Sequence, residues 1–81
     1  MTAFADLLEE LRPMLRDGEF ADWRWNPRKP INDPSSWLAW VYADDAGCDE
    51  PGVPEKLLSG GQSGEEALRK LVAKVREARR P

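Results

Sequence analysis

Residues 36–43, with the sequence Ser-Trp-Leu-Ala-Trp-Val-Tyr-Ala, decide the fold that we predict for this chain. The stretch is rich in aromatic and β-branched residues, which favour a strand. Successive side chains of a strand point to opposite faces. One face would carry Trp37, Ala39, Val41 and Ala43, and the other Leu38, Trp40 and Tyr42. Because both faces are bulky, we expect one set to pack in the core and the other to lie toward solvent or a partner.

A second strand is predicted at residues 19–25, where side chains of different character alternate. One of its faces would hold Ala21, Trp23 and Trp25, and the other Phe20, Asp22 and Arg24. The three prolines of residues 26–35 exclude a helix and a central strand, so this segment should be an exposed loop. Residues 44–54 are dense in acids and turn formers and predict another loop, and residues 55–59 predict a short strand at a sheet edge.

A helix is predicted on each side of these strands. Residues 3–16 carry apolar side chains at helical spacing, namely Phe4, Leu7, Leu8, Leu11 and Leu15. Pro13 cannot donate a backbone hydrogen bond and crowds the preceding turn, so this helix should kink or end near Arg12. Asp17 and Gly18 then form a stop signal.

The second helix should follow Ser63, because Ser63 and Glu66 match a capping box in which the serine caps the helix and the glutamate reaches back. Its buried stripe would consist of Leu68, Leu71, Val72 and Val75. Lys74, Arg76, Arg79 and Arg80 should form a solvated face near the negative end of the helix dipole. The whole chain, residues 1–81, is therefore expected to be one α+β domain of helix-sheet-helix (αβββα) order. We expect an antiparallel two- or three-stranded meander with both helices on one face.

The net charge of −3 is unevenly distributed along the chain. Residues 17–55 hold nine acids against three bases, a balance of −6, whereas residues 56–81 hold three acids against seven bases, a balance of +4. Acidic surface repels phosphate backbones and attracts basic protein surfaces. We therefore expect a basic protein partner and no direct binding of nucleic acid by the central region.

No reaction is predicted from the sequence. The chain has no histidine, and Cys48 stands alone in an acidic segment that disfavours its thiolate. The glycine-rich residues 60–64 lack the lysine of a phosphate-binding loop. Residues 44–55 have Ala46 and Cys48 where a calcium loop requires oxygen ligands, and Asp49 where it requires glycine. We expect a non-enzymatic protein without metal or cofactor.

The sequence also predicts a cytoplasmic protein. The N-terminal residues lack the basic region of a signal peptide, and no apolar run approaches the length of a membrane span. A single cysteine excludes an intramolecular disulfide, so nothing indicates an oxidising compartment.

In its small size, acidity, order of elements and final Gly-Gln-Ser-Gly-Glu-Glu-Ala-Leu-Arg-Lys-Leu-Val stretch, the chain resembles small accessory proteins encoded by phages and prophages. Among these, anti-CRISPR inhibitors are similar in kind. The resemblance implies a small acidic protein that occupies the basic nucleic-acid channel of a CRISPR effector (Cascade-like) complex. It covers the layout and roughly the last 20 residues, and it assigns a role to no individual residue.

The leading hypothesis is therefore a protein-binding inhibitor that blocks DNA access through an acidic surface with aromatic anchors. The predicted partner-binding residues are Asp33, Asp44, Asp45, Asp49, Glu50, Trp40 and Tyr42. A first alternative is a structural or assembly protein that self-associates, for example as a homodimer, through an aromatic sheet face. A second is a single-stranded nucleic-acid binder that uses Trp23, Arg24 and Trp25.

Overall fold

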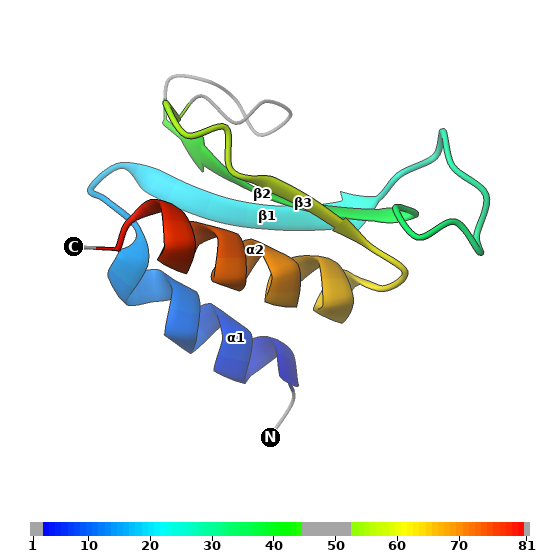
Figure 1. Ribbon diagram of the computed structural model, residues 1–81, viewed down its shortest axis with the longest axis horizontal. Coiled ribbons are helices and arrows are strands. Elements are labelled where there is room, and N and C mark those ends of the chain that lie inside the picture. The colour runs from blue at the N-terminus through cyan, green and yellow to red at the C-terminus, as the bar shows by residue number, and fades with distance from the viewer. Residues whose placement is uncertain (1–2, 45–52, 81) are drawn as a thin grey trace.

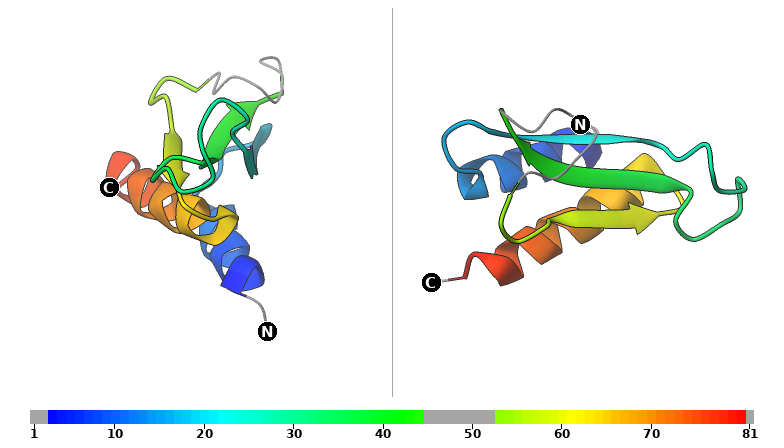
Figure 2. Two further views of the ribbon diagram at one scale, coloured as in Figure 1. Left: turned by 90° about the vertical axis from the view of Figure 1, so that its right-hand side faces the viewer. Right: turned by 90° about the horizontal axis from the view of Figure 1, so that it is seen from above.

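A computed structural model describes residues 3–44 and 53–80 of the protein. Its elements are the helix α1 (Ala3–Leu11), a 3₁₀ turn (Arg12–Met14), the strands β1 (Glu19–Trp25), β2 (Trp37–Ala43) and β3 (Leu58–Gly61), and the helix α2 (Gly64–Ala78). The predicted α+β fold with the order α-β-β-β-α is confirmed. Both helices lie on the same face of the sheet, as Figure 1 and the left view of Figure 2 show.

The sheet is an antiparallel meander with β2 in the centre. β1 pairs with β2 so that Trp23 lies opposite Ala39, and β2 pairs with β3 so that Trp40 lies opposite Leu58. The backbone hydrogen bonds of β2 alternate between its two neighbours. Asp44, just beyond β2, donates to Gly18 at 3.0 Å on the β1 side, and Val41 donates to Leu57 at 3.0 Å on the β3 side.

The core lies between the helices and the face of β2 that carries Ala39 and Val41, both fully buried. The apolar stripe predicted for α2 meets this face, and the buried side chains of the cluster include Leu11, Leu68, Leu71, Val72 and Val75. The predicted division of β2 into two faces is thus confirmed. β3 approaches α2 closely, because a Cβ atom at Gly61 would lie 2.6 Å from the backbone nitrogen of Ala67.

Two local expectations about α1 and α2 can be compared with the structure. α1 ends at Leu11 and continues as a 3₁₀ turn that contains Pro13, so the predicted interruption by this proline is confirmed. At α2 the hydroxyl of Ser63 accepts a hydrogen bond from the amide of Glu66 at 3.1 Å, as predicted. The carboxylate of Glu66 pairs with Lys70 at 3.2 Å, so we find half of the expected capping box.

The third strand was placed wrongly by the prediction, which assigned it to residues 55–59 whereas β3 is Leu58–Gly61. The reason is a turn in which Lys56 has a positive φ of 53° and its amide donates to the carbonyl of Val53 at 3.1 Å. Pairing can begin only after this turn. Gly60 and Gly61 lie in the strand at positions where side chains would crowd Ser35 and α2.

Candidate functional site

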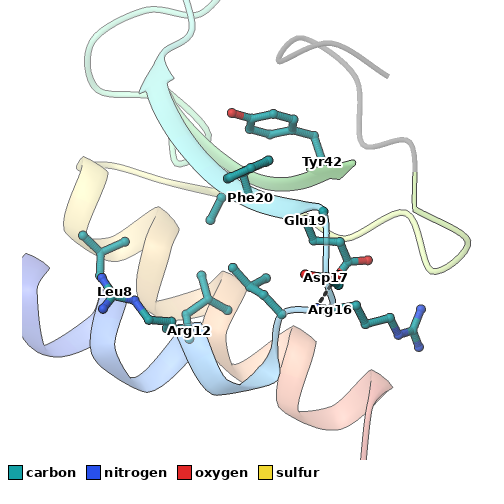
Figure 3. A pocket seen from close by; sticks show the side chains of 11 residues that line it. Leu8, Arg12, Arg16, Asp17, Glu19, Phe20 and Tyr42 are labelled. Atoms are coloured by element: carbon teal, nitrogen blue, oxygen red, sulfur yellow. Dashed lines mark hydrogen bonds between the residues drawn. The ribbon is translucent and has the colours of Figure 1, made fainter. Parts of the chain in front are cut away.

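A groove of about 620 Å³ crosses the outer edge of β1 where this strand begins. It is lined by Leu8, Leu11, Arg12, Leu15, Arg16, Asp17, Gly18, Glu19, Phe20, Ala21 and Tyr42. Figure 3 shows Phe20 and Tyr42 on one side of β1 and the side chains of α1 and the 3₁₀ turn on the other. The rings of Phe20 and Tyr42 lie 5.7 Å apart, and Phe20 is 47% exposed. The groove therefore offers apolar contacts on both sides of the strand.

A tight turn holds the start of β1 against the end of the 3₁₀ turn. Gly18 adopts a φ of 81°, a left-handed conformation that glycine adopts without steric cost. The amide of Glu19 donates to the carbonyl of Arg16 at 3.0 Å, and the amide of Arg16 donates to the carboxylate of Glu19 at 2.8 Å. These bonds hold a turn whose residues line the groove.

Behind this turn lies a cluster of charged side chains centred on Arg79 of the α2 C-terminus. Its guanidinium donates to both carboxylate oxygens of Glu19 at 2.6 and 2.9 Å, to Glu55 at 2.8 and 3.2 Å, and to the carbonyl of Met14 at 2.8 Å. The side chains of Arg79 and Glu19 are only 8% and 6% exposed. One buried arginine thus joins the α2 terminus to the start of β1 and to the turn before β3.

The cluster sets the charge state of its members. Hydrogen bonds from Arg79 hold the pKa values of Glu19 and Glu55 below their ordinary range, although burial opposes this effect. The same pairing raises the pKa of Arg79 above its ordinary range. Glu19, a carboxylate that lines the groove, is therefore ionised at neutral pH, which does not suit a proton donor. Among the described residues no group of three or more potential metal ligands occurs.

The predicted acidic surface is only partly described by the structure. Asp33 lies in the loop before β2 and Asp44 follows the other end of that strand. Seven strand residues span roughly 20 Å, so these two carboxylates do not form one patch. Asp44 lies near the groove, because a Cβ atom at Gly18 would be 3.4 Å from its carboxylate. Asp45, Asp49 and Glu50 lie outside the described residues.

The two predicted aromatic anchors differ in accessibility. Trp40 is only 4% exposed, and the Arg24 guanidinium lies 5.9 Å from its ring centroid. Its indole is therefore unavailable as a main anchor for a partner. Tyr42 is half-buried and lines the groove beside Phe20. Tyr42 is the predicted anchor that belongs to the groove.

The structure separates the residues of the predicted stacking platform. Trp23 is on the helix-facing side of β1, where its ring stacks on Phe4 with centroids 5.3 Å apart. Trp25 shares that side and meets Trp37 edge-on at 6.0 Å. Arg24 lies on the opposite face, over Trp40. The three side chains thus do not form one surface for a nucleic-acid strand.

The backbone of β1 is an open sheet edge that begins at Ala21, which lines the groove, and continues to Trp25. The amide of Asn26 donates to Ser36 and Gly18 accepts from Asp44, so the even-numbered residues of β1 face β2 and the odd-numbered ones face outward. Along residues 21–25, the outward amide of Trp23 is bonded to the Asp22 carboxylate at 2.8 Å. No other described residue bonds the outward groups of this stretch. The apolar groove therefore adjoins available backbone donors and acceptors, which it meets at Ala21.

Several groove residues were not identified as site residues from the sequence. Phe20 could have been found, because the alternation of residues 19–25 already placed it on the face opposite Ala21, Trp23 and Trp25. Leu8 and Leu15 were assigned to the core stripe of the first helix, and only the position of that helix under the sheet brings them to the groove. The Arg79 cluster joins residues 60 positions apart, for which the sequence carries no local signal.

Comparison with protein-family models, with curated proteins and with solved structures gives no match for this chain. No helix of the described residues has the length and apolar character needed to cross a membrane.

Proposed function

We propose that this protein is a binding module whose partner contact is the groove across the edge of β1. The observation that carries the proposal is that three features adjoin one another along β1. They are a groove of about 620 Å³, the exposed ring of Phe20 beside Tyr42, and backbone groups of β1 that face outward. Exposed apolar surface combined with a free strand edge is typical of sites that accept an extended segment of a protein.

The shape of the groove favours such a segment over a small molecule. An extended chain places successive side chains on opposite sides of its backbone. A strand added to β1 would direct alternate side chains toward Phe20 on one side and toward Leu8 and Leu15 on the other. The exposed Arg12, Arg16 and Asp17 at the rim would then contribute to orientation and specificity.

A photo-cross-linking experiment tests this proposal. A benzoyl-phenylalanine at position 20 should cross-link to a protein in the producing cells, because Phe20 lines the groove. The same residue at Ile31, which is 76% exposed in the loop before β2, is the matched control. We expect cross-linked products from position 20 that are absent from position 31. Equal products from both positions, or none from either, would contradict the proposal.

The finer hypothesis of an anti-CRISPR inhibitor stays a prediction that depends on the resemblance described above. Its acidic surface would require Asp44 to act together with Asp45, Asp49 and Glu50. Reversing these four residues to lysine should abolish inhibition of DNA binding by a purified CRISPR effector complex while the circular dichroism spectrum is unchanged. Unaltered inhibition by that variant would exclude the electrostatic mechanism, and absence of inhibition by the natural chain would exclude the hypothesis.

A further inference from the structure

We infer that the protein segment bound at this groove is β1 of a second copy of the chain, paired antiparallel with β1 about Trp23. The inference rests on the proposed function, because it names the partner of the same groove. The result would be a two-fold symmetric dimer with a continuous six-stranded sheet and all helices on one face. Symmetric dimers of this kind use the same surface twice.

The hydrogen bonding of β1 permits this pairing without disturbing the existing sheet. Ala21, Trp23 and Trp25 direct their amides and carbonyls away from β2, as the bonds at Gly18 and Asn26 define. With Trp23 opposite Trp23 of the second copy, Ala21 of each copy lies opposite Trp25 of the other. All three residues then exchange hydrogen bonds in the regular antiparallel pattern. Both helices lie beneath the sheet (Figure 2), so the added strand extends the sheet beyond β1.

Charge selects this register among those that keep the hydrogen-bonding pattern. With Trp23 at the two-fold axis, Asp22 of each copy lies directly opposite Arg24 of the other on the same sheet face, which gives two oppositely charged pairs. Sliding one strand by two residues keeps the pattern, but it places Asp22 opposite Asp22 of the other copy in one direction and Arg24 opposite Arg24 in the other direction. Neither shifted register pairs Asp22 with Arg24. Opposite charges directly across two strands are stabilising and like charges destabilising.

Size also matches across the pairing. Ala21 is a small residue on the helix-facing side of β1 and lines the groove. Its opposite residue in the second copy would be Trp25, a bulky side chain that is 36% exposed in the single chain. The indole would lie over Ala21 on the side of the groove formed by Leu8 and Leu15. Each copy thereby completes the groove of the other, and both remove an exposed tryptophan from water.

Asp22 has a defined role in both states. In the single chain its carboxylate occupies the outward amide of Trp23 at 2.8 Å. In the dimer this amide donates a hydrogen bond to the carbonyl of Trp23 of the second copy. The Asp22 carboxylate is then released to pair with the guanidinium of Arg24 of the second copy. The opposite edge is less suited to this pairing, since β3 has only four residues and Lys74 donates to the outward carbonyl of Leu58 at 2.7 Å.

A charge-swap series with the full chain tests the register. Asp22→Arg and Arg24→Asp each place like charges opposite one another twice, so each should raise the dimer dissociation constant about tenfold. The double variant Asp22→Arg/Arg24→Asp restores both pairs and should return the constant to near that of the natural chain. Sedimentation equilibrium gives the constants, and circular dichroism shows that each variant is folded. A chain that is monomeric at all concentrations, or a double variant as weak as the single ones, would overturn the inference.

Disulfide formation provides an independent test in a Cys48→Ser background. Asp22 and Arg24 of the second copy would form a non-hydrogen-bonded pair. The Cα atoms of such a pair are about 4.5 Å apart, within the range that a disulfide spans. A mixture of Asp22→Cys and Arg24→Cys chains should form a cross-linked dimer on mild oxidation, whereas either chain alone should not. Equal cross-linking of an Ile31→Cys control would contradict the inference. If the chain is monomeric but position 20 still cross-links to another protein, the inference fails and the proposed function stands.

Discussion

The two edges of the sheet are protected to different degrees. β3 has four residues, packs against α2, and has its outward Leu58 carbonyl occupied by Lys74. β1 has seven residues, and along its outward positions 21–25 only the amide of Trp23 has a partner among the described residues. Short length and lysine side chains are common ways to prevent unwanted strand pairing. The comparison indicates that the β3 edge is shorter and better protected, and that the β1 edge offers more unpaired backbone for binding.

The helices account for this asymmetry. α2 has 15 residues and lies against β3, with Gly61 allowing backbone contact between the two elements. α1 has nine residues and ends at Leu11, because the chain enters a 3₁₀ turn at Arg12 and Pro13. The side chains after this end line the groove under β1. An interrupted first helix therefore leaves one edge of the sheet with space beside it.

The largest predicted effect concerns Arg79, which anchors the start of β1 and the turn before β3 at the same time. Arg79→Ala leaves the carboxylates of Glu19 and Glu55 without their main partner. Removing one member of a buried ionic cluster costs about 3–5 kcal/mol of folding free energy. Urea denaturation should show a loss of this size. Arg80→Ala is the control, because Arg80 is exposed and pairs with Glu77, and it should change stability by less than about 0.5 kcal/mol.

A smaller loss is expected when β3 is pushed away from α2. The Cβ atom of Gly61→Ala would meet the backbone of Ala67 at 2.6 Å, and backbone cannot move aside as a side chain can. Overpacking of this kind costs about 1–3 kcal/mol. At Gly60 the nearest atom is the Ser35 side chain at 3.3 Å, so Gly60→Ala should cost less. Thermal melts of both variants compare their losses of stability. A loss for Gly60→Ala that equals or exceeds that for Gly61→Ala would refute the close packing of β3 on α2.

Acidification should weaken the ion pairs of Arg79 with Glu19 and Glu55, and lower the free energy of unfolding by a smaller amount. The pKa values of Glu19 and Glu55 are lowered in the folded protein, chiefly by hydrogen bonds from Arg79, from an ordinary value of 4.5. A lowered pKa contributes stability that is present above the unfolded value and is lost as pH falls through the folded value. We expect unfolding free energy to decline below about pH 4.5. The decline should be shallower in Glu19→Gln, and an identical pH profile would exclude this carboxylate as its source.

The sequence predicted those parts of the structure that depend on neighbouring residues. The alternation of residues 36–43, the interruption at Pro13 and the serine cap at Ser63 all act within a few positions, and the structure confirms them. The position of β3 was wrong because the left-handed turn at Lys56 has no distinctive sequence pattern.

The candidate site was less predictable because it depends on contacts between distant segments. Arg79 was expected on a solvated face, yet it is buried against Glu19 and Glu55. Its helical position offered no signal, since the partners come from β1 and from the turn before β3. Tyr42 was identified as a contact residue from its strand face alone. Its neighbours in the groove follow from the packing of α1 beneath the sheet.

The edge-on contact of Trp25 and Trp37 gives the protein a built-in optical reporter. The centroids of these indoles lie 6.0 Å apart at an interplanar angle of 90°. The two residues lie directly opposite each other on the neighbouring strands β1 and β2. Chromophores this close couple their electronic transitions, so the pair should produce an exciton couplet in circular dichroism. Because the coupling requires β1 and β2 to be in register, its disappearance would signal separation of these strands. Fraying of the sheet could thus be followed in solution without attaching a label.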